Sequence, residues 1–276
     1  MKQSQAKKRD NAMTNKILMG LIALVLGLLF LEILIVHSKN EQQKNASNQV
    51  QTARIMANGD LLYHDGLYMS ALQSDGSYDF TENFTYVKPW LKQADLVLGD
   101  FEGTINPDYP LSGYPLFNAP QSVTAAIKDA GYDVMDLAHN HILDSGLEGA
   151  FTTADAFKKV GIDPIGVYEK PVRDKAPLLI KNVNGIKVAI LSYAYGYNGL
   201  ESNLTDKEVA DHLSNLDEKR MKAEIQRAEK EADITVIMPQ MGVEYRLEPT
   251  DEQVKLYHKM IDWGADIIFG GHPHVV

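Results

Sequence analysis

Short apolar segments that alternate with longer amphipathic segments place the strongest limit on how this chain can fold. The apolar segments predict buried β-strands at residues 54–60, 95–102, 132–137, 233–238 and 267–269. The amphipathic segments predict helices at residues 84–93, 120–130, 147–160, 217–231 and 250–263. Strands that alternate with helices of about ten to fifteen residues form βαβ units. The pattern therefore predicts an α/β protein with a mostly parallel sheet.

A second pattern adds an antiparallel element. Two strand-like segments, residues 178–183 and 186–193, flank the dipeptide Asn184-Gly185. Asn-Gly between apolar segments is a strong short-range sign of a β-hairpin, because both residues tolerate a positive φ. We therefore expect a mixed sheet or two separate sheets.

The N-terminal region has the composition of a membrane anchor. Residues 17–36 are nearly all apolar, and a helix of this length crosses a hydrocarbon core of ~30 Å at ~1.5 Å per residue. The basic residues that precede this segment are Lys2, Lys7, Lys8, Arg9 and Lys16. A basic flank predicts a cytoplasmic N-terminus and places the remainder of the chain outside the cell membrane. Glu32 lies close enough to the outer end of the segment to reach the interface.

A cleaved signal peptide is the alternative to an uncleaved signal-anchor. The apolar segment is longer than the ~7–15 residues of an ordinary signal-peptide core, and residues 35–37 carry no small-x-small cleavage pattern. Both features favour the anchor. The predicted organisation is a cytoplasmic basic tail (1–16), a transmembrane anchor (17–36), a polar linker (37–52) and a folded extracellular domain (53–276). Because only a short loop follows the last predicted strand, we expect the domain to continue past residue 276.

Composition excludes two kinds of partner or site. The net charge of −10 argues against a nucleic-acid partner bound through its phosphates. The absence of cysteine rules out disulfides and thiolate metal sites. A phosphorylated or carboxylated substrate remains compatible with this charge, since a bound metal reverses the local field.

Residues that can bind metal follow several of the predicted strands. They are Asp60, Asp100 with Glu102, Asn140 with His141, and His272 with His274. Each alone is an ordinary turn or capping residue, but ligands bind at the carboxyl ends of parallel strands, where all of these lie. Carboxylate, amide and imidazole groups suit Mn, Fe, Zn or Mg ions, and a shared carboxylate could bridge two of them. The sequence therefore predicts a site for up to two divalent metal ions. Glu244, close after another strand, is expected to contact a metal ligand or the substrate.

The order of these motifs resembles that of a known family. The motifs are Gly59-Asp60, Gly99-Asp-Phe-Glu-Gly103, Asn140-His-Ile-Leu-Asp144, Gly242-Val-Glu-Tyr245 and Gly271-His-Pro-His274. They resemble the successive motifs of the poly-γ-glutamate capsule synthesis proteins, the CapA/PgsA family of the calcineurin-like metallophosphatase superfamily. The resemblance implies a four-layer α-β-β-α sandwich with mixed sheets and a two-metal cleft. It also implies a membrane-anchored protein of capsule biosynthesis.

Carried over residue by residue, the resemblance implies roles for particular side chains. The implied metal ligands are Asp60, Asp100 or Glu102, Asn140, His272 and His274, with His141 as the general acid at the leaving group. Three positions depart from the family pattern. Asp60-Leu61-Leu62 lacks the histidine of the usual Asp-x-His motif, and Gln240 stands where the family often has histidine. His139 is additional and is expected to point away from the Asn140 side of the strand.

Two functions remain open at this stage. In the first, the protein is a metal-dependent hydrolase in which activated water attacks phosphorus or a carbonyl and His141 protonates the departing group. In the second, it is a non-catalytic accessory of a membrane capsule-polymer synthase that binds the anionic polymer. Gln240 favours the accessory, because an amide is a poorer metal ligand than imidazole. Asn140-His141 and the histidines at 272 and 274 favour the hydrolase.

Overall fold

The computed structural model describes residues 19, 31–39 and 50–275. The chain divides into two compact units, Met1–Gln51 and Thr52–Val276. In the first unit, residues 31–39 are helical. The predicted transmembrane segment, residues 17–36, lies mostly outside the described residues. Among the residues that are described, none of the helices combines the length and the apolar character needed to span a bilayer.

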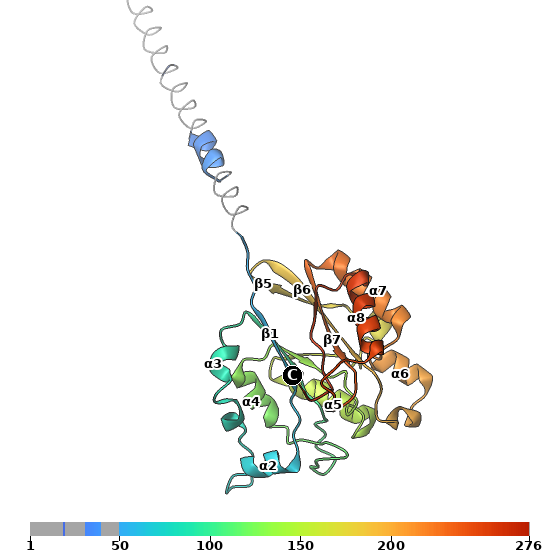
Figure 1. Ribbon diagram of the computed structural model, residues 1–276. Helices are drawn as coiled ribbons and strands as arrows, with labels where there is room; N and C mark the ends of the chain where they lie inside the picture. Colours follow the sequence, from blue (N-terminus) through green and yellow to red (C-terminus); the bar gives the residue numbers. More distant parts are fainter. Residues whose placement is uncertain (1–18, 20–30, 40–49, 276) are drawn as a thin grey trace, which may run out of the picture. The chain divides into compact units, whose positions relative to one another are not determined.

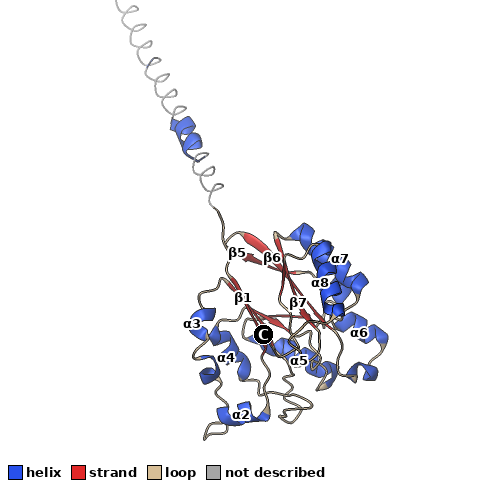
Figure 2. Ribbon diagram, in the orientation of Figure 1, coloured by secondary structure: helices blue, strands red, loops and turns tan. Residues whose placement is uncertain are grey.

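Two four-stranded sheets form the centre of the second unit (Figures 1 and 2). The first sheet is parallel throughout and consists, in order, of β1 (Ile55–Asp60), β2 (Leu96–Asp100), β3 (Val134–Asp136) and β4 (Asp163–Ile165). The second consists of β5 (Leu179–Val183), β6 (Ile186–Ala194), β7 (Ile234–Gln240) and β8 (Ile267–Ile268). Only the β5–β6 pair in this second sheet is antiparallel. The expectation of a mixed α/β protein with two sheets is confirmed.

Helices cover the outer face of each sheet. The helices are α2 (Asp65–Ala71), α3 (Lys88–Leu91), α4 (Val123–Ala130), α5 (Gly146–Lys159), α6 (Asp206–His212), α7 (Glu218–Glu231) and α8 (Asp251–Trp263). Short 3₁₀ turns occupy Thr81–Phe84, Arg173–Lys175 and Leu200–Asn203. Thr205 and Thr250 each close a capping box, which satisfies backbone N–H groups at the starts of α6 and α8.

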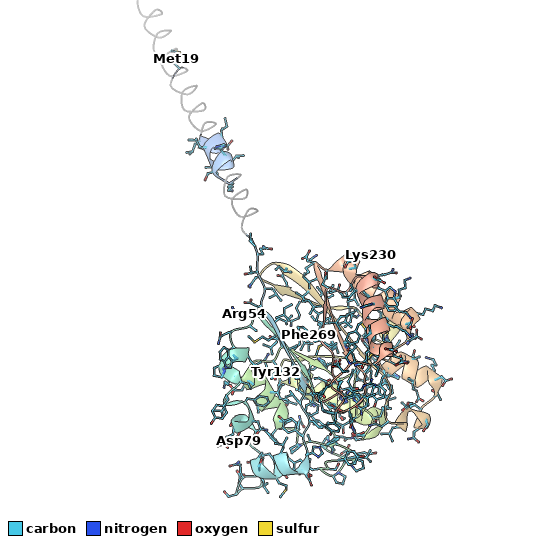
Figure 3. All side chains as sticks on the ribbon, viewed as in Figure 1. Met19, Arg54, Asp79, Tyr132, Lys230 and Phe269 are labelled. Atoms are coloured by element: carbon cyan, nitrogen blue, oxygen red, sulfur yellow. The ribbon has the colours of Figure 1, made fainter. Side chains whose placement is uncertain are left out.

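Alternating strand residues divide the core into three layers of apolar side chains. Figure 3 shows the described side chains on the ribbon. Leu98 of β2, Val188 of β6 and Val236 of β7 lie in the layer between the sheets. Their neighbours along the strands, such as Val97 and Ile237, belong to the outer layers, where the helices pack. Because strand side chains alternate between faces, both sheets are buried on both sides. The result is an α-β-β-α arrangement.

The predicted hairpin between β5 and β6 is confirmed. Asn184 has φ 54° and Gly185 has φ 91°, which is the backbone of a type I′ turn. Val183 pairs with Ile186 across the turn, so the register follows directly from the two-residue loop.

The predicted elements differ from the structure at several points. The helix predicted at 84–93 is only the four-residue α3, because Pro89 lacks the N–H that would extend it toward its N-terminus. β2 ends at Asp100, two residues earlier than predicted. β4, α2 and α6 were not predicted, since each is short and β4 contains Pro164.

Candidate metal centre

Three aspartates lie side by side at the carboxyl ends of the first three strands. Asp60 pairs with Asp100, and Asp100 pairs with Asp136. A register shift between Ala57 and Asp60 brings the end of β1 level with that of β2. Asp60 and Asp100 were predicted site residues, whereas Asp136 was missed. Asp136 lies inside the strand predicted at residues 132–137, so no signal in the sequence marked it as a site residue.

The second sheet brings its histidines to the same place. After β8 the chain continues beside β7, where Gly271 bridges to Gln240, and then turns into His272 and His274. A Cβ at Gly271 would lie 3.2 Å from Oδ1 of Asp60 and 3.3 Å from Oδ2 of Asp100. A side chain here would crowd both carboxylates, so glycine suits this close approach of the ends of the two sheets.

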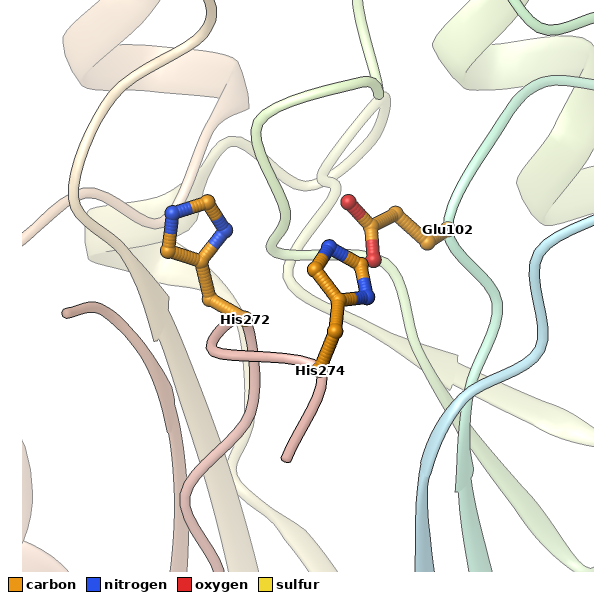
Figure 4. Close-up of side chains that lie close together, drawn as sticks. All are labelled: Glu102, His272 and His274. Carbon is orange, nitrogen blue, oxygen red and sulfur yellow. The ribbon is translucent and has the colours of Figure 1, made fainter. Parts of the chain in front are cut away.

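Glu102, His272 and His274 form a compact donor group (Figure 4). One ligand atom of each lies within 4.8 Å of the others. Nδ1 of His274 also lies 3.2 Å from Oδ2 of Asp60. His272 and His274 both adopt a left-handed backbone, with φ of 92° and 56°. Such strained conformations persist at ligand sites, where the surrounding structure enforces them. A cleft of about 490 Å³ opens beside the two histidines and Asp60.

Several polar atoms of this group point inward without a hydrogen bond. They are Oδ1 of Asp60, Oδ1 of Asp100, Oε2 of Glu102 and Nδ1 of His272, and the described part of the chain offers them no partner. Buried polar atoms are nearly always hydrogen-bonded in folded proteins, because leaving one unpaired costs about 1–3 kcal/mol. A divalent cation is a suitable partner for atoms of this kind, since carboxylate oxygens and imidazole nitrogens are its usual ligands. The residues therefore fit a metal ion.

The crowded carboxyl groups resist ionisation in the absence of a cation. Burial and then the charge of Asp60 raise the pKa of Glu102 to about 9. Burial raises the pKa of Asp136 to about 8 and, with the charges of Asp136 and Asp60, raises that of Asp100 well above its usual value. Burial lowers the pKa of His272, which keeps its imidazole neutral and able to bind metal.

His141 is oriented by an aspartate that the sequence analysis did not assign a role. Nδ1 of His141 lies 2.8 Å from Oδ2 of Asp144, and the same oxygen accepts the backbone N–H of Phe117 at 2.6 Å. The Phe117 ring packs edge-on against the imidazole at 4.8 Å. A carboxylate at Nδ1 holds the proton there, which directs Nε2 away from Asp144 as the exchanging nitrogen. The signal for this pair was the i, i+3 spacing of His141 and Asp144.

Asn140 and Gln240 form a buried pair. Nε2 of Gln240 donates to Oδ1 of Asn140 at 2.9 Å, and the Asn140 backbone N–H donates to Oε1 of Gln240 at 3.0 Å. His139 is fully buried, and its ring nitrogens contact no hydrogen-bonding group among the described residues. Glu244 is exposed but close enough that its negative charge opposes the lowering of the His272 pKa. The roles predicted for these residues stay predictions.

Two tyrosines that the sequence analysis did not assign pack on the site histidines. The ring of Tyr195 lies 4.7 Å from that of His272, and Tyr245 stacks on His274 with its centroid 5.8 Å away. The Tyr245 N–H donates to the Pro273 carbonyl at 2.7 Å, which ties the motif around Glu244 to the histidine loop. A larger groove of about 770 Å³ runs along residues 199–220. We place the site at the smaller cleft because Asp60, His272 and His274 line it.

The two sheets with their flanking helices define an α-β-β-α protein that carries a cluster of potential metal ligands. A family profile described as the bacterial capsule synthesis protein PGA_cap matches residues 54–276, and the chain belongs to that family. The capsule biosynthesis protein CapA of Bacillus anthracis is 33% identical over 202 residues, which cover 70% of this chain and 48% of that protein. The PGA biosynthesis protein CapA of Bacillus subtilis (strain 168) is 28% identical over 272 residues, 98% of this chain and 69% of that protein.

A solved structure shares the fold. It is a proposed 5′-nucleotidase from Staphylococcus aureus in complex with α-ketoglutarate, with a TM-score of 0.53 and 16% sequence identity. The likeness covers 80% of this chain and 46% of the other. The chain therefore spans about half the length of that structure and of the B. anthracis relative. At this identity the likeness concerns the fold alone.

Proposed function

We propose that this protein is a membrane-anchored component of capsule-polymer biosynthesis, of the poly-γ-glutamate type, with a metal-dependent hydrolase-like site. Family membership supports the role in capsule biosynthesis. The observation that carries the metal site is the cluster of Glu102, His272 and His274, whose ligand atoms lie within 4.8 Å of one another. The scissile bond belongs to a phosphoester or to the anionic polymer itself.

The ion would be held by Glu102, His272 and His274, with Asp60 beside them. The two imidazoles favour Mn²⁺, Fe²⁺ or Zn²⁺ over Mg²⁺. When bound, such an ion supplies Lewis-acid polarisation of a phosphoryl or carbonyl oxygen. Its positive charge also offsets the carboxylates at this edge, which would otherwise repel an anionic substrate.

His141 is the residue proposed to move a proton. Asp144 fixes the ring at Nδ1, so Nε2 is the nitrogen placed to give a proton to the leaving group. The edge of Phe117 prevents the ring from turning. Asp144 therefore acts through His141 and not on the substrate.

Replacing His141 tests the catalytic role. A positioned general acid contributes about 10²–10⁴-fold in rate, so His141→Ala should lower metal-dependent turnover of a phosphoester or polymer substrate by that factor. Bound metal, measured by elemental analysis of the full chain, should stay at the wild-type level. His258→Ala, which changes an exposed histidine of α8, is the control and should leave both quantities unchanged.

The alternative function is a non-catalytic accessory that binds polymer for the membrane subunits of a capsule-polymer synthase. The specific observation in its favour is the Gln240–Asn140 pair, which occupies the amide oxygen that the family resemblance assigns to a metal. Under this alternative, cells that carry His141→Ala produce normal amounts of polymer and the wild-type chain hydrolyses nothing. That combination would exclude the catalytic role of His141.

The proposed topology has residues 17–36 in the membrane and the folded domain outside. The basic flank and the length of the apolar segment support it. Protease added to intact cells should remove the domain and leave an N-terminal tag protected. Digestion of the tag together with an intact domain would show the opposite orientation.

A further inference from the structure

The pair formed by Asn140 and Gln240 bears on how many ions the site can hold. Both side chains are buried, with exposed fractions of 2% and 1%. Gln240 ends β7, where its Cα pairs with Ala194 on one side and its backbone bridges to Gly271 on the other. The position of the Gln240 side chain is therefore fixed by the pairing of β7 with its neighbours.

The orientation of both amides follows from a backbone donor. The Asn140 N–H can only donate, so the Gln240 atom 3.0 Å from it must be the oxygen. Nε2 of Gln240 therefore faces Oδ1 of Asn140, at 2.9 Å. Nδ2 of Asn140 donates to Oδ1 of Asn198 at 3.1 Å, which agrees with this orientation of the Asn140 amide. Turning either amide would place like atoms against each other.

This hydrogen-bonded pair disfavours binding of a cation at Oδ1 of Asn140. Oδ1 of Asn140 already accepts from Gln240, and the positive end of the Gln240 amide points at it. Oε1 of Gln240 is likewise engaged by the Asn140 backbone. The ligand atoms that remain unpaired belong to other residues, Asp60, Asp100, Glu102 and His272. Across the described residues, the compact group of three donors is Glu102, His272 and His274.

We propose that Gln240 makes this a one-ion site by holding Asn140 in a hydrogen-bonded pair. The ion lies with Glu102, His272 and His274, and the position next to Asn140 takes no second ion. This inference rests on the proposed metal site and deepens it. The proposed hydrolysis would then use one cation together with the His141–Asp144 pair, and not two cations.

Mn²⁺ is the probe for this inference, because its electron paramagnetic resonance distinguishes isolated from paired ions. Ions about 3.5–4 Å apart in a two-metal site are coupled magnetically. The full chain is freed of metal and titrated with Mn²⁺, with stoichiometry from calorimetry. We expect one ion per wild-type chain and the six-line signal of isolated Mn²⁺.

Two replacements of Gln240 supply the contrast. Gln240→Glu keeps the shape and the acceptor for the Asn140 N–H but loses the donor that engages Oδ1. Gln240→His supplies the imidazole common in the family. We expect both variants to bind a second Mn²⁺ and to show a coupled spectrum. Gln93→Glu and Gln93→His, at an exposed position beside Arg54 just before β1, are the matched controls and should bind one ion.

The outcomes separate the inference from the proposed function. Two coupled ions in the wild-type chain would overturn the one-ion inference and leave the metal site standing. One ion in both Gln240 variants, with the fold intact by circular dichroism, would show that Gln240 does not set the number. Absence of bound Mn²⁺ from the wild type would contradict the metal site itself, and the inference with it.

Discussion

Two clusters of buried charge in the folded unit differ in how their polar atoms are satisfied. Arg173, which is 3% exposed, makes two hydrogen bonds of 3.0 Å to the carboxylate of Glu224. It also donates to the Leu213 carbonyl and to Asn215, while the Tyr193 hydroxyl donates to Glu224 at 2.9 Å. The metal-site carboxylates, by contrast, repel one another and leave inward atoms unpaired.

The difference separates a structural cluster from a ligand site. Burial disfavours the charged form of Arg173, but the hydrogen bonds and charge of Glu224 outweigh it and raise the pKa of Arg173. This cluster is complete within the protein and supports the connection between β6 and α7. At the metal site, burial raises the pKa values of the carboxyl groups. Among the described residues, no Lys or Arg lowers the pKa values of Asp100, Glu102 and Asp136. A bound cation would supply the positive charge that this site lacks.

Breaking the complete cluster should have the largest effect on stability. Arg173→Ala leaves the half-buried Glu224 without its cationic partner, which should lower the free energy of unfolding by about 3–5 kcal/mol. Urea unfolding measures this, and metal bound per folded chain should not change. The control is Lys259→Ala, which breaks the exposed ion pair with Glu218 and should cost about 0–1 kcal/mol. Equal effects of the two changes would contradict the structural role of Arg173.

Removing the histidines should abolish stabilisation by metal. Mn²⁺ at 100 times its dissociation constant should stabilise the wild-type chain by about 2.7 kcal/mol. His272→Ala combined with His274→Ala removes two of the three clustered donors, so added Mn²⁺ should no longer raise the unfolding temperature. Differential scanning calorimetry with and without Mn²⁺ measures this. A metal-dependent shift that survives in the double variant would place the ion elsewhere.

Much of the fold could be predicted because its signals are local. Asn184-Gly185 specified a hairpin, and the apolar strands of both sheets were visible as runs of about the expected length. β4 was not predicted, because a strand of three residues is too short to show a periodic pattern. It belongs to the sheet through its pairing with β3, which is a tertiary contact.

The site could be predicted only in part for the same reason. Asp60, Glu102, His272 and His274 were visible as polar residues after strands, and the structure brings them together. The Gln240–Asn140 pair joins residues 100 positions apart, so spacing along the sequence says nothing about it. Asp136 gave no motif and becomes noticeable only when β3 lies in register with β2.

The smallest expected effect concerns Asp136 and the pH dependence of the metal-free chain. With a folded pKa of about 8 against an ordinary value near 4, Asp136 holds a proton in the native state that the unfolded chain has released. The stabilisation is complete below pH ~4 and is lost as the pH rises through about 8, by at most ~1.4 kcal/mol per pH unit.

Asn cannot ionise but keeps the oxygen that accepts the Ala138 N–H, so Asp136→Asn should lose less stability between pH 6 and 8 than the wild type. Urea unfolding in a chelator at these two pH values measures the slope, and Asp262→Asn on exposed α8 should leave it unchanged. Parallel slopes for Asp136→Asn and the wild type would mean that Asp136 is already ionised in the folded chain, and the contrast between the two clusters would then rest on Asp100 and Glu102 alone.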